Sequence, residues 1–251
     1  MSAGYNHIDI DECKKQSISV GFTPDVLTDT TADLAVALVL AAARRVVESA
    51  NAVKAGEWTS WKPMWMTGKD VHHSKVGIVG LGSIGAAIAR RMRGFGCSIQ
   101  YTGASGPKPA VAEPLAAEYV DMDMLLSSSD FVILACALTP QTKHLVNAEA
   151  LGKMKNDAVL VNIARGDVVE QDALVAALQE GSILAAGLDV TSPEPLAVDH
   201  PLLSLPNCVV LPHIGSASVP TRELIANMAA DNVLAGLAGK QLPFPVPGTS
   251  K

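Results

Sequence analysis

The chain has 251 residues, 49 % of them hydrophobic and only 4 % aromatic, a length and composition that suit one large α/β domain or two unequal ones. The formal net charge is −6 and the sequence has no basic block, which argues against nucleic acid or an anionic membrane as a partner. The longest apolar run, residues 34–43, is too short to span a bilayer, and we recognise no secretory leader, so we predict a soluble, cytoplasmic protein.

The four cysteines are scattered along the chain and form no Cys-x-x-Cys pair: Cys13, Cys97, Cys136 and Cys208. Such spacing is typical of buried thiols in a reducing compartment, not of a disulfide framework or a zinc site. We therefore predict neither disulfides nor a metal site.

The first quarter of the chain predicts a short strand, a long helix and a tryptophan-rich loop. Ser17-Ile-Ser-Val-Gly21 is the strand candidate, and apolar residues at helical spacing predict a helix across residues 29–55 that stops at Gly56. All three tryptophans lie within residues 58–65. Because an isolated loop would not expose three indoles to water, we expect them to pack against a second subunit, or alternatively over a local mini-core.

A glycine-rich turn follows, in the sequence Lys75-Val-Gly-Ile-Val-Gly80-Leu-Gly82-Ser-Ile-Gly85. The apolar run before it predicts a buried parallel strand, and the residues after it predict a helix. In a Gly-x-Gly-x-x-Gly turn between strand and helix, the glycines permit a tight turn, close approach of a pyrophosphate and close helix packing. The helix N-terminus then faces the phosphates, so this segment predicts dinucleotide binding.

Strands and helices alternate after this turn, which predicts an α/β fold with a doubly wound parallel sheet of the Rossmann type. A helix is expected at residues 171–180, closed by Gly181, and a final helix at residues 221–237 precedes a proline-rich tail. The strand candidates are residues 98–102, 131–135, 158–163, 185–190 and 208–211.

The end of the second strand predicts the choice of cofactor. NAD enzymes usually carry Asp or Glu there to bind the ribose 2′-OH, whereas this chain has Thr102-Gly-Ala104-Ser105-Gly. No carboxylate would repel a 2′-phosphate, and Thr102, Ser105 and Lys108 could bind one. We therefore favour NADP(H) as cofactor and keep NAD(H) as the alternative.

Three further strand ends carry polar groups suited to chemistry: Arg165, Glu194 and His213. The fork of an arginine suits a carboxylate, and His and Glu suit acid–base work. Each residue alone is explained equally well by a surface ion pair, a loop acid or a loop histidine. Because all three follow strands at the edge where a dinucleotide would lie, we predict that they form an active site.

The motifs at these positions resemble the D-2-hydroxyacid dehydrogenase family, and the match runs through essentially the whole chain. They are Gly-Leu-Gly-Ser-Ile-Gly, Asn-Ile-Ala-Arg-Gly-Asp, Leu-Asp-Val-x-x-x-Glu-Pro and Pro-His-Ile-Gly, in that order. The Trp-Thr-Ser-Trp-Lys-Pro loop and Asp189-Val-Thr-Ser-Pro-Glu-Pro are most similar to the glyoxylate reductase/hydroxypyruvate reductase branch.

This resemblance implies a role for each matching residue. Arg165 would bind the carboxylate of a 2-keto acid, His213 would donate a proton to its carbonyl oxygen, and Glu194 would orient His213 and favour its protonated form. Asp189 would lie near the nicotinamide. Ala3, Gly4 and Ser216 would complete the substrate pocket, together with Arg165, Asp189 and His213. The cofactor would contact Gly80, Gly82, Ser83, Ile84, Ala104, Ser105, Ala137, Ile163, Asp189 and Gly215.

The resemblance also implies a division of the chain into domains and an incomplete substrate domain. Residues 1–22 would be the remnant of an N-terminal substrate domain, residues 23–220 the dinucleotide-binding domain with a dimerisation helix and loop at 29–65, and residues 221–251 a helix and tail returning toward the substrate domain. With most of that lid absent, we expect this chain to bind dinucleotide but turn over slowly. The branch also tends to carry Arg where this chain has Ala104, which weakens the preference for NADP.

The function predicted is thus NADP(H)-preferring reduction of glyoxylate or hydroxypyruvate to glycolate or D-glycerate, by a homodimer. The alternatives are an NAD-dependent dehydrogenase of other specificity, a non-catalytic dinucleotide-binding scaffold, or an inactive variant. The key residues do not exclude a scaffold, because scaffold relatives can retain them.

Overall fold

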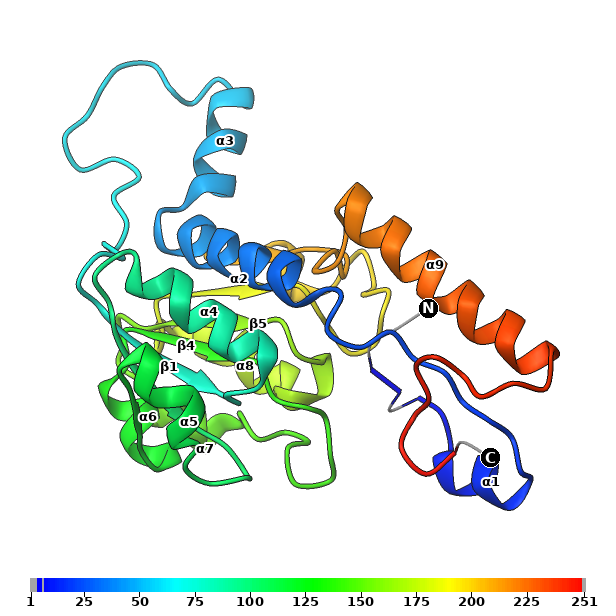
Figure 1. The fold of residues 1–251 in the computed structure, drawn as a ribbon. Coiled ribbons are helices and arrows are strands. Elements are labelled where there is room, and N and C mark those ends of the chain that lie inside the picture. Colours follow the sequence, from blue (N-terminus) through cyan, green and yellow to red (C-terminus); the bar gives the residue numbers. More distant parts are fainter. Residues whose placement is uncertain (1–3, 6, 250–251) are drawn as a thin grey trace. The chain divides into compact units, whose positions relative to one another are not determined.

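The computed structural model describes residues 4–5 and 7–249 (Figure 1). They form two compact units, one of residues 32–215 and the other of the described residues up to Thr31 and from Ser216 onward. The predicted division into a substrate-domain remnant at residues 1–22, a dinucleotide-binding domain at residues 23–220 and a returning helix and tail at residues 221–251 stays a prediction.

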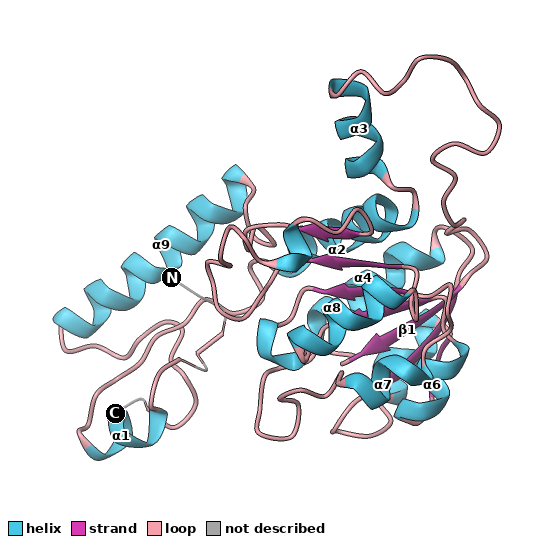
Figure 2. Ribbon diagram, turned by 180° about the vertical axis from the view of Figure 1, so that it is seen from behind, coloured by secondary structure: helices cyan, strands magenta, loops and turns pink. Residues whose placement is uncertain are grey.

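The larger unit is built on a sheet, drawn in magenta in Figure 2. Within the described chain this sheet has seven parallel strands in the order β3-β2-β1-β4-β5-β6-β7. This confirms the predicted doubly wound fold, and the strands predicted within this unit are present with ends shifted by at most two residues. The unpredicted strand is β3, whose Ala-Glu-Tyr sequence is largely exposed and has no apolar run. The strands are β1 (Lys75–Val79), β2 (Ser98–Thr102), β3 (Ala117–Tyr119), β4 (Phe131–Leu134), β5 (Val159–Asn162), β6 (Ala185–Leu188) and β7 (Cys208–Val210).

Two apolar layers cover the sheet, because alternate side chains of each central strand point to opposite faces. In β4, Ile133 belongs to the layer that packs with α2 and α4, and Leu134 to the layer that packs with α6, α7 and α8. The helices of this unit are α2 (Thr28–Ala43, which starts in the smaller unit), α3 (Val46–Lys54), α4 (Ser83–Arg93), α5 (Pro109–Ala112), α6 (Met122–Ser128), α7 (Ala148–Lys153) and α8 (Gln171–Glu180). Short 3-10 turns lie at η1 (Glu113–Leu115), η2 (Gly166–Val168) and η3 (Pro201–Leu203).

The single helix predicted across residues 29–55 is wrong, because the chain breaks into α2 and α3 at Arg45. Arg45 adopts a left-handed backbone conformation (φ 52°), and its guanidinium makes two 2.7 Å hydrogen bonds to Glu48. The end of α2 is covered by another segment: the N–H of Lys69 donates to the carbonyl oxygen of Ala43 at 2.8 Å. A Cβ on Gly68 would lie 2.2 Å from that oxygen, so the two backbones are in direct contact.

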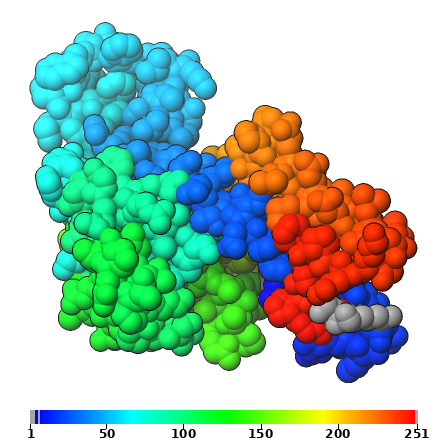
Figure 3. Space-filling view, in the orientation of Figure 1, coloured from blue at the N-terminus to red at the C-terminus, as the bar shows by residue number. Residues whose placement is uncertain are grey.

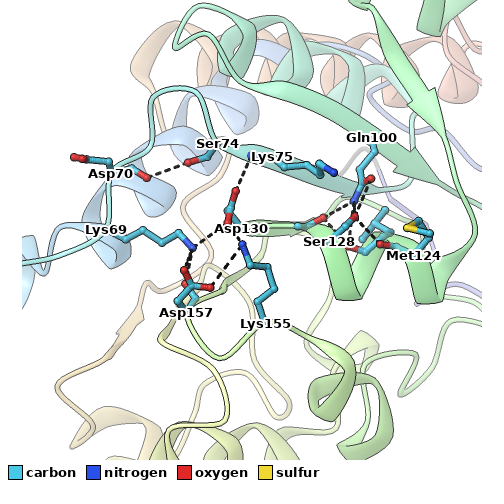
Figure 4. Close-up of polar contacts among 12 residues, drawn as sticks. Lys69, Asp70, Ser74, Lys75, Gln100, Met124, Ser128, Asp130, Lys155 and Asp157 are labelled. Carbon is cyan, nitrogen blue, oxygen red and sulfur yellow. Dashed lines mark hydrogen bonds and ion pairs between the residues drawn. The ribbon is translucent and has the colours of Figure 1, made fainter.

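A network of ion pairs joins the amino ends of β1, β4 and β5 (Figure 4). Asp130 accepts hydrogen bonds from the backbone N–H of Lys75 (2.8 Å) and from the ammonium groups of Lys69 (3.1 Å) and Lys155. Lys69 also pairs with Asp157 at 2.7 Å. Burial raises the pKa of Asp130, but the contacts with Lys155, the Lys75 N–H and Lys69 outweigh it and lower that pKa to about 2.

The smaller unit contains α1 (Ile10–Lys15) and α9 (Val219–Leu237). The strand predicted at residues 17–21 is wrong: Ser17 has a positive φ of 55°, and the segment forms an isolated bridge between Gly21 and Pro245. The buried Asn232 of α9 links the two sides of this bridge, because it donates to Phe22 O (3.1 Å) and accepts from the N–H of Phe244 (3.0 Å). No helix among the described residues is long and apolar enough to cross a membrane.

All four cysteines are free thiols, of which Cys97 is buried and the other three are partly buried. The expectation that all of them are buried is therefore correct for Cys97 alone. Burial raises the pKa of Cys97 and Cys136, and that of Cys208 to about 12, so these thiols are poor nucleophiles.

Candidate active site

The three glycines of the turn after β1 meet different steric demands. Gly80 has φ +101°, and a Cβ there would lie 2.9 Å from the backbone of Ala135. A Cβ on Gly85 would lie 2.1 Å from the carbonyl oxygen of Gly80, so α4 packs directly on the turn. Gly82, in contrast, has no atom within 4 Å of the position of a Cβ. Gly80 and Gly85 are therefore needed by the fold, whereas the space beside Gly82 is open.

The N-terminus of α4 fits a phosphate group. Gly82 is its N-cap and supplies no side-chain hydrogen bond, while Ser83 and Ile84 form the first turn. The basic residues of the helix, Arg90, Arg91 and Arg93, lie in its last turn, and its first turn has no acidic residue. Peptide N–H groups and the positive end of the helix dipole therefore provide the attraction for an anion here.

Beyond the end of β2, exposed Ala104 and Ser105 lie in the turn that follows buried Thr102. The side chain of Lys108 reaches back from this segment, and its ammonium donates to the carbonyl oxygen of Leu81 at 3.1 Å. The backbone N–H of Lys108 donates to the hydroxyl of Tyr101 at 2.7 Å, which fixes the loop on β2. A positive charge therefore lies beside the glycine-rich turn.

The remaining predicted cofactor residues of the larger unit also follow the carboxyl ends of strands. Ala137 follows β4 and is exposed, Ile163 follows β5 and is buried, and Gly215 lies beyond β7 and is buried. The strand order reverses between β1 and β4, next to the glycine-rich turn. Ligands of open α/β sheets bind at such a switch point.

Arg165 lies in the turn after β5. Asn162, the last residue of that strand, holds this turn by two hydrogen bonds. The Asn162 side chain donates to Arg165 O and accepts from Ala164 N, both at 3.0 Å, and is 1 % exposed. The Arg165 guanidinium donates to the carbonyl oxygen of Ala164 at 2.7 Å. The sequence did not single out Asn162, although a buried Asn closing an apolar strand is the signal that could have found it.

Glu194 and His213 are brought together from the loops after β6 and β7. His213 Nδ1 lies 2.8 Å from Glu194 Oε2, and both side chains are partly exposed, at 48 % and 38 % respectively. Because an ionised carboxylate can only accept, Nδ1 carries the proton of this hydrogen bond. The other ring nitrogen, Nε2, is then the atom that can exchange a proton with a substrate.

Asp189 shapes the turn that carries His213. Its carboxylate oxygens accept hydrogen bonds from the N–H groups of Ile214 and Gly215, both at 2.8 Å, and its carbonyl oxygen accepts from His213 N at 2.9 Å. His213 adopts a positive φ of 54° in this turn. Burial raises the pKa of Asp189 above its usual value, and the two N–H donors only partly oppose this effect. No sequence pattern around Asp189 indicated this contact.

The other predicted substrate residues are Ala3, Gly4 and Ser216. Ala3 lies outside the described residues. Gly4 and Ser216 belong to the smaller unit. Among the described residues, no group of three or more His, Cys, Asp or Glu side chains is arranged to hold a metal ion.

Comparison with known proteins now defines the family. Residues 36–215 match the family described as "D-isomer specific 2-hydroxyacid dehydrogenase, NAD binding domain". The chain belongs to this family. It is 55 % identical to the human glyoxylate reductase/hydroxypyruvate reductase and 52 % identical to a glyoxylate/hydroxypyruvate reductase B of Escherichia coli, over 97 % and 96 % of this chain and 74 % of each relative.

Solved structures agree with this assignment. An NADPH-dependent glyoxylate/hydroxypyruvate reductase from Sinorhizobium meliloti, in complex with NADP and malonate, superposes with a TM-score of 0.89 at 36 % identity. The alignment covers 99 % of this chain and 76 % of that one. The protein is therefore an oxidoreductase of the 2-hydroxyacid dehydrogenase family with an NAD-binding domain, which confirms the predicted enzyme class and nicotinamide dinucleotide cofactor.

Proposed function

We propose that this dehydrogenase reduces glyoxylate or hydroxypyruvate to the corresponding 2-hydroxy acid, glycolate or D-glycerate, and prefers NADPH. The observation that carries the proposal is the 2.8 Å contact between His213 Nδ1 and Glu194 Oε2, on the strand-end side that also holds the glycine-rich turn. Relatives about 50 % identical are named for both substrates, which supports these over other keto acids.

In this proposal each residue has a distinct task. The dinucleotide, when bound, supplies the hydride. His213 donates a proton from Nε2 to the keto oxygen, and Glu194 holds the ring in the tautomer and orientation that this transfer requires. Arg165 binds the substrate carboxylate, because a guanidinium offers several N–H donors in one plane. Asp189 holds the turn of His213 and contributes to the nicotinamide pocket.

The preference for NADPH rests on charge at the end of β2. No carboxylate is present at residues 102–106 to bind a ribose 2′-OH or to repel a 2′-phosphate. The ammonium of Lys108 lies beside the glycine-rich turn, where it would attract a 2′-phosphate, with Ser105 as a second donor. Gly80, Gly82, Ser83, Ile84, Ala104, Ala137, Ile163 and Gly215 would line the rest of the cofactor groove.

We also propose a homodimer formed through α2, α3 and the tryptophan loop. In Figures 1 and 3 this loop, drawn in cyan, extends away from the helices that cover the sheet. Trp58 and Trp61 are 61 % and 79 % exposed and Met64 is 78 % exposed, so a local mini-core beneath the loop is ruled out for these side chains. Exposed apolar side chains gathered on one loop are typical of an interaction surface.

Steady-state reduction of glyoxylate and hydroxypyruvate with NADPH or NADH tests the catalytic proposal. His213→Ala should lower kcat by about 10² to 10⁴ and leave the cofactor Kd nearly unchanged. His72→Ala is a matched control, because His72 is an exposed histidine that precedes the amino end of β1. Turnover that His213→Ala does not affect, or no turnover by the unsubstituted protein, would contradict the proposal and favour a scaffold.

A further inference from the structure

Glu194 lies in the loop of residues 191–195, and each oxygen of its carboxylate has a hydrogen-bond partner. Glu194 Oε1 accepts from the backbone N–H of Thr191 at 3.1 Å, while Oε2 is 2.8 Å from His213 Nδ1. The Thr191 hydroxyl also donates to the carbonyl oxygen of Pro193 at 2.9 Å. The position of the carboxylate therefore depends on the position of this loop.

Ser192, in the same loop, is fixed by two residues outside it. The side-chain amide of Gln171 donates to Ser192 O at 2.9 Å and accepts from Ser192 N at 3.1 Å. The Ser192 hydroxyl donates to Asp167 Oδ1 at 2.5 Å. Because one amide pairs with both backbone groups of one residue, it fixes the peptide planes on either side of Ser192. The Nε2 atom of His200 lies 3.1 Å from the same Gln171 nitrogen, which restrains the amide from the other side.

The segment that carries Arg165 is packed against this loop as well. A Cβ on Gly166 would lie 2.0 Å from Thr191 O and 2.6 Å from Ser192 N, so the two backbones touch. Asp167 follows directly and Gln171 begins α8. The residues that hold Ser192 thus follow Arg165 closely in the sequence. Because Gln171 is the first residue of α8, this helix resists a shift of the loop.

We propose that Gln171, assisted by Asp167, is a positioning residue that keeps the carboxylate of Glu194 on Nδ1 of His213. The inference rests on the proposed function, since it assigns Gln171 a role only through that pair. A purely structural role for Gln171 at the start of α8 would alter stability but not the hydrogen bond between Glu194 and His213. The two explanations therefore differ in what a substitution changes.

Gln171→Met tests this, because methionine has a similar length and neither donates nor accepts as the amide does. The control is Gln179→Met, a change of the same type at an exposed position of the same helix. We expect Gln171→Met to lower kcat by about ten- to a hundredfold, as small misplacements of catalytic groups do, with KM for hydroxypyruvate and the cofactor Kd changed less than about twofold. The pH–rate profile for reduction should shift toward lower pH, as we also expect for Glu194→Gln, because a carboxylate next to the ring favours its protonated form. Gln179→Met should match the unsubstituted protein.

A second readout does not depend on turnover. The Nδ1–H proton of His213 should give a downfield NMR resonance in the unsubstituted protein and in Gln179→Met, and should be lost or broadened in Gln171→Met and in Glu194→Gln. If Gln171→Met does not fold, Ser192→Ala removes only the bond to Asp167, and we expect a weaker form of the same changes. Persistence of the resonance together with an unshifted pH profile overturns the positioning role. Loss of the resonance with no effect of His213→Ala on turnover would instead contradict the proposed function.

Discussion

Substitution of Gly82 and Gly85 should separate cofactor binding from folding within a single turn. At Gly82 the backbone φ is −92° and no atom lies within 4 Å of a Cβ, so Gly82→Val meets no steric obstacle in the protein itself. Loss of a favourable N-cap should cost about 0.5–1 kcal/mol of unfolding free energy. The added side chain would fill the space in which we propose that the pyrophosphate binds, and we expect the NADPH Kd to rise at least about tenfold, or about 1.4 kcal/mol.

Gly85→Ala should have the opposite effect. Its Cβ would lie 2.1 Å from the carbonyl oxygen of Gly80, a backbone atom that cannot rotate away. Overpacking of this kind costs about 1–3 kcal/mol and sometimes more, and we expect at least the upper end here because α4 must separate from β1. A large part of the stability of a typical domain would be lost.

Urea unfolding measures the stability of the two variants, and fluorescence titration with NADPH measures binding. The expected pattern is weak binding with near-normal stability for Gly82→Val, and low stability for Gly85→Ala. An unchanged Kd for Gly82→Val would show that the dinucleotide does not bind at this turn. Equal stability of Gly85→Ala and the unsubstituted protein would refute the packing explanation.

The other predictions concern specificity, pH and assembly. Lys108→Ala should weaken NADPH binding about tenfold while leaving NADH binding unchanged, and an equal loss for both cofactors would count against a 2′-phosphate contact. Asp130→Asn should lower the unfolding free energy near pH 7 by about 2 kcal/mol. The pKa of Asp130 is about 2 in the folded state and near 4 in the unfolded state, so its ionised form stabilises the fold above about pH 4. This contribution is lost as the pH falls toward about 2. Acid titration of stability should therefore be shallower in Asp130→Asn than in the unsubstituted protein. Light scattering should give a dimer mass at micromolar concentration and a monomer mass for Trp58→Ser/Trp61→Ser, and a monomer in the unsubstituted protein would contradict the proposed dimer.

Local signals explain what could be predicted from the sequence. The apolar run before Gly80 and the glycine spacing both act within about ten residues, and they predicted β1, the turn and α4 correctly. The helix at residues 171–180 was likewise predicted with its ends, because Gly181 closes it with a positive φ of 72°. The strand ends carrying Arg165 and His213 followed from the alternation of strands and helices.

Contacts between distant segments explain what could not be predicted. The break at Arg45 depends on Lys69 and Gly68, which approach α2 from a later loop, and no residue near position 45 signals it. The hold of Gln171 on Ser192 joins residues 21 positions apart, and glutamine at a helix start has many other possible roles. A sequence pattern can place such residues on an element but cannot show which partner each side chain reaches.

Charged groups at the amino ends of the strands stabilise the fold, whereas those at the carboxyl ends are arranged for chemistry. This explains why the residues at the carboxyl ends of the strands were informative. At the amino edge, the carboxylate of Asp130 accepts hydrogen bonds from Lys69, Lys155 and a backbone N–H, so the charged groups there are paired with one another. At the carboxyl edge, His213 and Glu194 pair through one ring nitrogen and one carboxylate oxygen, and their side chains remain 48 % and 38 % exposed. A charged pair that is only half enclosed contributes little to folding, so its precise support by Asp189 and the loop of residues 191–195 is better explained by a task that begins when a substrate arrives. Substitutions at the amino edge should therefore change stability without changing turnover, and those around His213 should do the reverse.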